Sequence, residues 1–270
     1  MKIVHRVTFK KEDNVDDRLV ALGIKYKKTP IFERYIITFE IDEADIRWSQ
    51  VEELIQDKNA LDIYDTFFTN EELLNGEWLR LEPTFEYGYP QPEGTWIKNP
   101  PNYAYKCLSC GVFQQKSSFI IQKEPELGKN DFMSLHWTHA FFCTPRVFDA
   151  LARNEIKGYE IWDVLLSETK LPSKQVSQLF VPIITKPGLA DQLSAVVCEI
   201  CGEKKYNVHK KGIMNFQRSA LSPNIDTIQT YEWFGHGHNA FREILVSNRL
   251  AKVILKNDWQ GVRLKLVELV

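Results

Sequence analysis

The first third of the chain alternates between strand-like and helix-like patterns of apolar residues. The predicted strands cover residues 2–9, 34–41 and 61–68, and the predicted helices cover residues 15–22 and 44–56. On the second strand, apolar side chains recur at every other position and so occupy one face, as expected for a strand with one buried side. The order strand, helix, strand, helix, strand predicts a small N-terminal α/β sandwich.

The pattern changes after this unit. Thr69, followed three positions later by Glu72, has the composition of a capping box and predicts a helix start. From Trp78 to Tyr105 the chain is rich in aromatic residues and proline, which excludes a long regular helix. Burial favours an extended connector whose rings pack between two halves of the protein, and the alternative is an exposed aromatic surface for a partner. We place the domain boundary in this stretch, with domains over residues 1–97 and 98–270.

The C-terminal part contains an internal repeat. Residues 141–166 align without a gap on residues 244–269. Both segments predict a strand, a capped helix, a turn and a strand, with Thr144 and Ser247 as the N-caps. Asn154 and Asn257 follow the last helical turn, where a left-handed residue is expected. The predicted copies extend over about residues 98–190 and 191–270.

Two Cys-x-x-Cys-Gly sequences contain four of the five cysteines, namely Cys107, Cys110, Cys198 and Cys201. A Cys-x-x-Cys turn brings two thiolates to one side of a loop, and two such turns complete a tetrahedral zinc shell. About 87 residues separate the pairs, more than in a compact zinc ribbon. Since one pair precedes each copy of the repeat, a two-fold arrangement of the copies explains how both pairs reach one zinc ion.

Two redox-active or disulfide-bonded pairs are the alternative interpretation of these cysteines. Redox motifs of this spacing open a helix after a strand, whereas both pairs here lie between extended stretches, which favours zinc. The fifth cysteine, Cys143, corresponds to Val246 in the other copy, an apolar strand position. We therefore expect Cys143 to be a buried thiol and not a ligand.

The composition restricts the class of protein and its possible partners but does not indicate a specific function. The chain has 270 residues, 44% of them hydrophobic, and a net charge of −2. It is long enough for a substantial core, and its charge gives no overall field that would attract nucleic acid or an anionic membrane. The first residues predict a strand and not a signal peptide, and no apolar run is long enough to span a membrane. We expect a cytoplasmic protein, in which reducing conditions favour metal thiolates.

The doubled Cys-x-x-Cys-Gly sequence and the doubled element of apolar strand, Ser/Thr cap, arginine and helix (residues 142–146 and 245–249) resemble the double-CxxCG motif family. Through the second copy the chain is also similar to immunity proteins of bacterial polymorphic toxin systems. The resemblance covers roughly residues 100–270. It implies a cytoplasmic zinc-binding protein that neutralises a cognate toxin by binding it.

Two further clusters suggest other functions. The histidines His136, His139, His236 and His238 have spacings that suit a second, catalytic metal, although structural hydrogen bonds explain them equally well. A basic run after the second cysteine pair, Lys204, Lys205, Lys210 and Lys211, suggests a nucleic-acid surface, although such lysines are usually solvated. No phosphate-binding loop, dinucleotide fingerprint or hydrolase nucleophile motif is present.

The sequence therefore predicts an α+β protein, with a small α/β sandwich followed by a duplicated β-α-β unit joined at a zinc-ribbon-like four-cysteine site. The predicted function is non-enzymatic binding of a protein partner, and the resemblance implies that this partner is a toxin. The first alternative is a zinc-ribbon protein that binds nucleic acid. The second is a metal-dependent enzyme that uses the His236 and His238 region.

Overall fold

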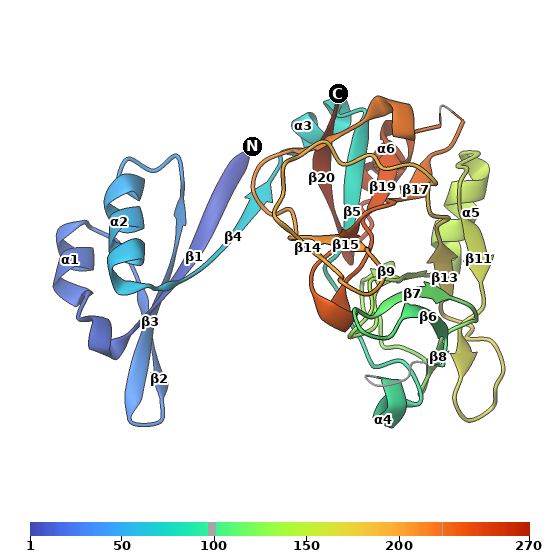
Figure 1. Ribbon diagram of the computed structural model, residues 1–270, viewed down its shortest axis with the longest axis horizontal. Coiled ribbons are helices and arrows are strands. Elements are labelled where there is room, and N and C mark those ends of the chain that lie inside the picture. Colours follow the sequence, from blue (N-terminus) through green and yellow to red (C-terminus); the bar gives the residue numbers. More distant parts are fainter. Residues whose placement is uncertain (97–100, 223) are drawn as a thin grey trace. The chain divides into compact units, whose positions relative to one another are not determined.

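A computed structural model of the chain describes residues 1–96, 101–222 and 224–270, without the side chains of residues 95 and 96 (Figure 1). The fold is mixed α+β and consists mostly of sheets. It divides into two compact units, Met1–Thr69 with Lys210–Gly212, and Asn70–His209 with Ile213–Val270. Within the described residues, no helix is both long enough and apolar enough to cross a membrane.

The N-terminal unit has the elements that the sequence predicts and one more strand. Its strands are β1 (Lys2–Lys10), β2 (Lys27–Ile31), β3 (Arg34–Asp42) and β4 (Leu61–Phe67), and its helices are α1 (Asp16–Ala21), α2 (Trp48–Lys58) and the 3₁₀ turn η1 (Lys11–Asp13). The strands form an antiparallel sheet in the order β2-β3-β1-β4. The additional strand, β2, lies at the edge and is largely exposed, so it has no apolar pattern for the sequence to reveal.

The core of this unit lies between one face of the sheet and the two helices. Val7 and Phe9 on β1 alternate with outward residues and pack in one cluster with Ile37 on β3, Leu19 on α1 and Leu54 on α2. This is the one-sided burial that the period of two predicts. The segment Lys210–Gly212 joins the same unit, because Thr66 Oγ1 donates to the carbonyl of Lys210 at 2.9 Å and accepts from the amide of Gly212 at 2.8 Å.

The second unit contains all remaining elements. Its helices are α3 (Asn70–Asn75), α4 (Glu93–Trp96), α5 (Pro145–Arg153) and α6 (Asn248–Lys256), with 3₁₀ turns η2 (Arg218–Ala220) and η3 (Gly237–Asn239). Its strands are β5 (Trp78–Pro83), β6 (Tyr103–Cys107), β7 (Val112–Gln115), β8 (Ile120–Ile121), β9 (Phe132–Met133), β10 (Phe141–Cys143), β11 (Glu160–Trp162), β12 (Leu165–Leu166), β13 (Ser177–Phe180), β14 (Ala195–Val197), β15 (Lys204–Tyr206), β16 (Met214–Phe216), β17 (Thr227–Gln229), β18 (Trp233–Phe234), β19 (Ile244–Ser247) and β20 (Val262–Leu269).

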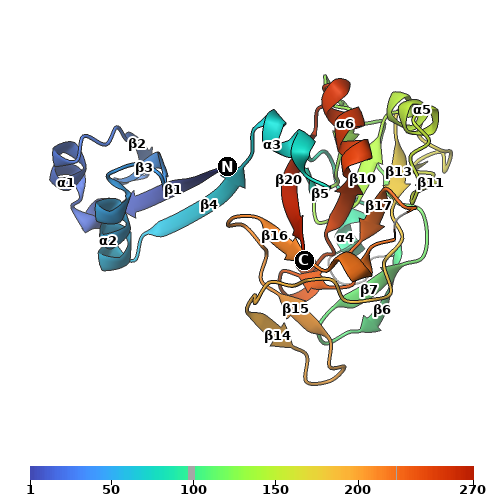
Figure 2. The same cartoon turned by 90° about the horizontal axis from the view of Figure 1, so that it is seen from above.

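Two sheets of this unit have related strand orders. One is β16-β20-β5-β19-β17 and the other is β11-β13-β10-β9. In the first, β5 pairs antiparallel with both β19 and β20, and in the second, β13 pairs antiparallel with both β10 and β11. Each strand-helix-strand segment therefore has a strand from elsewhere in the chain inserted between its two strands. The helices α5 and α6 contact one another, and both ribbon views show them adjacent (Figures 1 and 2).

The position of β5 changes the predicted domain boundary. The expected boundary at residue 97 falls outside the described residues, but the compact division comes at Thr69 and Asn70. Residues 78–83 are a central strand of the five-stranded sheet, with Leu79 and Leu81 buried. The first residues of the aromatic stretch are therefore not a connector between domains, because β5 is hydrogen-bonded to β19 and β20 within the second unit. Further along, Phe85, Tyr87 and Tyr103 pack against a buried cluster, while the side chain of Trp96 and the whole of Pro100 lie outside the described part of the chain.

The two helix ends differ from the prediction by one residue. Asn154 and Asn257 have φ angles of −96° and −88°, and the left-handed residues are the next ones, Glu155 and Asp258, at 51° and 49°. The reason is that each asparagine amide donates back into the helix, from Asn154 to the Ala150 carbonyl at 2.8 Å and from Asn257 to the Val253 carbonyl at 2.7 Å. The two asparagine side chains thereby provide hydrogen-bond donors for carbonyls of the last helical turn. The left-handed residue that ends each helix therefore comes one position after the asparagine.

Candidate metal centre

Each cysteine pair forms the turn of a β-hairpin. Cys107 ends β6, and β7 begins directly after Gly111, while Cys198 follows β14 and β15 begins at Lys204. In the first turn the amide of Gly111 donates to the Cys107 carbonyl at 2.9 Å, and in the second the amide of Gly202 donates to the Cys198 carbonyl at 2.8 Å. Both glycines are left-handed, with φ angles of 74° and 73°, a conformation that is inexpensive only without a Cβ atom.

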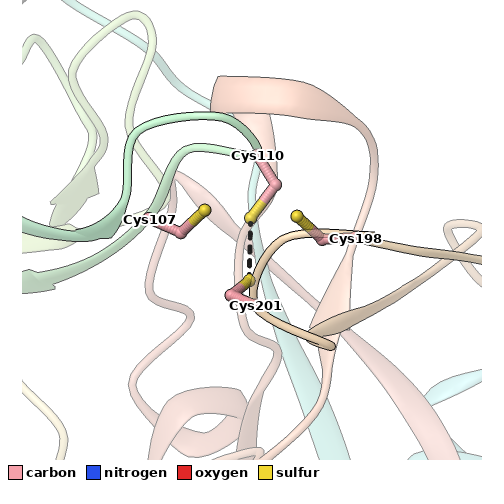
Figure 3. Close-up of side chains that lie close together, drawn as sticks. All are labelled: Cys107, Cys110, Cys198 and Cys201. Carbon is pink, nitrogen blue, oxygen red and sulfur yellow. Dashed lines mark hydrogen bonds between the residues drawn. The ribbon is translucent and has the colours of Figure 1, made fainter.

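The two turns bring their four sulfur atoms together (Figure 3). All four Sγ atoms lie within 4.8 Å of one another. Cys110 Sγ and Cys201 Sγ are 3.6 Å apart, far beyond the roughly 2.05 Å of a disulfide bond. For a tetrahedral ion with metal–sulfur bonds of about 2.3 Å, the expected separation of two sulfurs is about 3.8 Å. The cluster can therefore hold one metal ion between the two hairpins.

Backbone amides around the sulfurs favour thiolates at two of the four positions. The amide of Cys110 lowers the pKa of Cys107, and the amides of Cys201 and Ile200 lower the pKa of Cys198 to about 7. At Cys201 the amide of Glu203 acts in the same direction, but burial and the neighbouring thiols outweigh it and raise the pKa to about 12. One thiolate thus opposes ionisation of the next, and a cation between them removes that repulsion.

Lys205 supports the centre from below the surface. Its side chain is 5% exposed, and its Nζ donates to the carbonyls of Cys110 and, at 2.6 Å, of Gly237. Burial lowers the pKa of this lysine, whereas the nearby cysteines act in the opposite direction. The ammonium group therefore joins the first hairpin, the second hairpin and the loop around η3. Sequence reasoning grouped Lys205 with a surface run, because only the fold shows that it is buried.

A small apolar core closes the centre on its inner side. It consists of Cys107, Val112, Trp233 and Ala240, with Cys110, Phe113 and Cys198 packed against it. The ring of His238 covers the first turn so closely that a Cβ atom on Gly111 would lie 2.7 Å from His238 Cγ. The corresponding position at Gly202 has no atom within 4 Å. The first hairpin is thus packed into the protein, and the tip of the second is open.

The four histidines, for which a second metal site was the alternative to structural roles, do not form a ligand group of three or more with one another or with other described residues. Among the described residues, the four cysteines are the only group of three or more histidine, cysteine or carboxylate ligands close enough to share an ion. His136 Nδ1 lies 3.0 Å from Glu86 Oε2. His139 stacks on Phe241, with ring centroids 3.6 Å apart. His236 and His238 flank the start of η3.

The remaining lysines of the basic run are exposed but lie in different surroundings. Lys204 places its Nζ 4.6 Å from the centroid of the Tyr206 ring, and Lys211 pairs with Glu43 in the N-terminal unit. Lys210 belongs to the N-terminal unit as well. With Lys205 buried, the four residues are not four equivalent solvent-facing cations.

The fifth cysteine is separate from the centre. Cys143 is fully buried in β10, and burial raises its pKa well above the ordinary value. The expectation of a buried thiol is confirmed. All five cysteines are free thiols in the structure. Comparison of the sequence with models of known protein families and with curated proteins finds no match.

Proposed function

We propose that Cys107, Cys110, Cys198 and Cys201 bind one zinc ion whose role is structural. Four thiolates in a tetrahedral arrangement are the donor set that structural zinc sites use. The observation that carries the proposal is that all four sulfurs lie within 4.8 Å of one another although the pairs come from distant hairpins. Such a shell has no position left for substrate or water, so the ion stabilises the fold and performs no chemistry.

We propose further that the ion joins two copies of one structural unit. The strand-helix-strand segments β10-α5-β11 and β19-α6-β20 support duplication, and so do the contacts that lie between them. The Lys157 amide donates to Asp226 Oδ2 at 2.8 Å, and the Gln260 amide donates to Asp131 Oδ2 at 3.2 Å. Each acidic residue also pairs with the arginine of its own helix, Asp131 with Arg146 and Asp226 with Arg249.

The strand pairing extends this relation. Leu81 of β5 lies opposite Ile244 and Leu264, and Leu179 of β13 lies opposite Phe141 and Ile161, which are the aligned positions of the other copy. The first strand precedes the first cysteine pair and the second strand precedes the second pair. The proposed duplication therefore uses copies over residues 70–170 and 171–270, which begin earlier than the copies expected from the sequence, so that each contains the strand before its own cysteine pair. With these bounds, each copy contributes its first strand to the sheet of the other copy. An exchange of this kind holds the two hairpins near one metal ion.

The protein-level role that we propose is binding of another protein, with toxin immunity as its specific form. Support comes from the tips of the cysteine turns, where Leu108 and Ile200 are 74% and 76% exposed. Val196 and Val197 on β14 are exposed as well. Apolar side chains held outward on a rigid, metal-tied turn suit a protein partner more than a nucleic acid. We therefore rank nucleic-acid binding by Lys204, Lys210 and Lys211 second, and an enzyme that uses His236 and His238 third.

A genetic and biochemical experiment tests this role. If an adjacent reading frame encodes a toxin, co-expression of this protein should restore growth, and the two purified proteins should form a complex. Leu108→Asp with Ile200→Asp should weaken that complex at least tenfold, because a buried apolar contact is replaced by charge. Lys204→Gln with Lys210→Gln is the matched surface control. An unchanged complex in the double aspartate variant, or loss of binding in the lysine control, would contradict the proposed surface.

A further inference from the structure

A cavity of about 500 Å³ lies in the second unit beside the cysteine hairpins. Its walls come from β6, β7 and β13 and from the segments around residues 137–140 and 238–244. The volume falls within the range of about 300–1,000 Å³ that is usual for small-molecule sites. Phe113 and Trp233 belong both to the cavity wall and to the apolar core behind the cysteines. The cavity therefore adjoins the metal centre without using its ligands.

The wall combines flat aromatic surfaces with uncharged polar groups. Trp137 is 43% exposed and has a φ angle of 66°, which is uncommon for a bulky residue and typical of positions held by their surroundings. The His139 ring lies parallel to Phe241, with an interplanar angle of 16°. Although His139 is accessible from the cavity, the protein around it lowers its pKa to about 4, so the ring is neutral at pH 7. The flat aromatic surfaces of the cavity wall favour a planar ligand.

Arg242 is the only arginine or lysine among the residues that line the cavity, and none of these residues is Asp or Glu. Its side chain is 8% exposed and lies over Trp233, 4.3 Å from the ring centroid. Nη1 donates to the Thr230 carbonyl at 2.9 Å, and Nε is buried without a hydrogen-bond partner among the described residues. Burial lowers the pKa of Arg242, and the charges of Glu203 and Glu232 act in the opposite direction. A buried guanidinium without a paired carboxylate is costly unless a ligand supplies the anion.

From this arrangement we infer that the cavity binds a planar aromatic small molecule carrying one carboxylate. The ring system lies among Phe113, Trp233 and the His139–Phe241 stack, and the carboxylate accepts hydrogen bonds from the Arg242 guanidinium. This site is independent of partner binding at Leu108 and Ile200, which lie at the turn tips and do not line the cavity.

The test uses 2-naphthoate as the probe, with 2-naphthalenemethanol as its uncharged counterpart, on full-length metal-loaded protein. Quenching of tryptophan fluorescence and titration calorimetry should both show saturable binding of one 2-naphthoate per chain. The alcohol should bind at least tenfold more weakly, because it cannot make a charge-assisted hydrogen bond. This comparison needs no variant. Absence of saturable 2-naphthoate binding, or equal affinity for the alcohol, would overturn the inference.

Variants locate the site. Arg242→Gln should bind the two probes with similar affinity, and Trp137→Ala, a change at an exposed residue, should weaken both. Arg153→Gln, on the exposed side of α5, is the matched control and should behave as wild type. Circular dichroism and thermal melting establish that each variant is folded. A folded Arg242→Gln protein that still prefers 2-naphthoate tenfold would refute the role of the guanidinium.

Discussion

The two turn glycines offer a comparison in which the backbone is constant and the surroundings differ. Gly111 and Gly202 occupy the same motif position with φ angles of 74° and 73°. Replacing either by alanine forces an L-residue into the left-handed region, which costs about 1–2 kcal/mol. At Gly202 the added Cβ meets nothing within 4 Å, so Gly202→Ala should lower the free energy of unfolding by about that amount.

At Gly111 the new Cβ would lie 2.7 Å from His238 Cγ and 2.9 Å from His238 Cα. Because one of these atoms belongs to the backbone, a side-chain rotation cannot relieve the contact completely. Overpacking of this kind adds about 1–3 kcal/mol. We therefore expect Gly111→Ala to cost about 2–5 kcal/mol in total, clearly more than Gly202→Ala.

Urea unfolding of the zinc-loaded proteins measures both losses, and competition with a chromophoric chelator measures the accompanying change in zinc affinity. Adding His238→Ala to Gly111→Ala should recover part of the loss, because it removes the ring and leaves the Cα atom. Equal destabilisation by the two glycine substitutions would refute the packing of His238 on the first turn. So would a double variant no more stable than Gly111→Ala alone.

Three further predictions concern the supports of the fold. Lys205→Met should lower stability by about 2–3 kcal/mol and raise the zinc dissociation constant at least tenfold, since two carbonyls lose a charged donor; exposed Lys204→Met is the control, and equal effects would contradict the buried role. The pKa of Asp226 lies below its ordinary value of 3.8 because its bonds to Arg249 and Ser247 outweigh burial, so wild-type stability should fall as the pH drops below about 4. Asp226→Asn should flatten this acid limb in melting experiments between pH 5 and pH 2, and an unchanged limb would assign it to other groups. Fragments 70–170 and 171–270 should each remain unfolded alone, by circular dichroism, because β5 and β13 pair with the other fragment's strands; a cooperative melt of either fragment would argue against strand exchange.

Much of the local structure follows from the sequence pattern. The strands and helices of the N-terminal unit lie within a few residues of their predicted ranges, because one-sided burial imposes a period of two on β1 and β3. The helix predicted after Thr69 is α3, and α5 and α6 begin after the expected caps, Thr144 and Ser247. These features depend on neighbours in the sequence, which is why pattern reasoning finds them.

The pairing of strands that are far apart in the chain has no comparable signal in the sequence. Nothing in residues 78–83 indicates that β5 pairs with strands more than 150 positions later, so the boundary was expected too late in the chain. The same limit applies to Lys205, whose neighbours Lys204 and Tyr206 suggest a surface position. The four cysteines are different, because their doubled motif defines the chemistry wherever the fold brings them together.

The central claim is that one zinc ion is bound by four cysteines from the two hairpins. Metal analysis of protein purified without chelator, together with zinc X-ray absorption, tests it most directly. We predict one zinc per chain with four sulfur neighbours at about 2.3 Å, lost in Cys107→Ser and retained in Cys143→Ser. A protein without zinc, or a Cys107→Ser variant that keeps both its metal and its melting temperature, would contradict the claim.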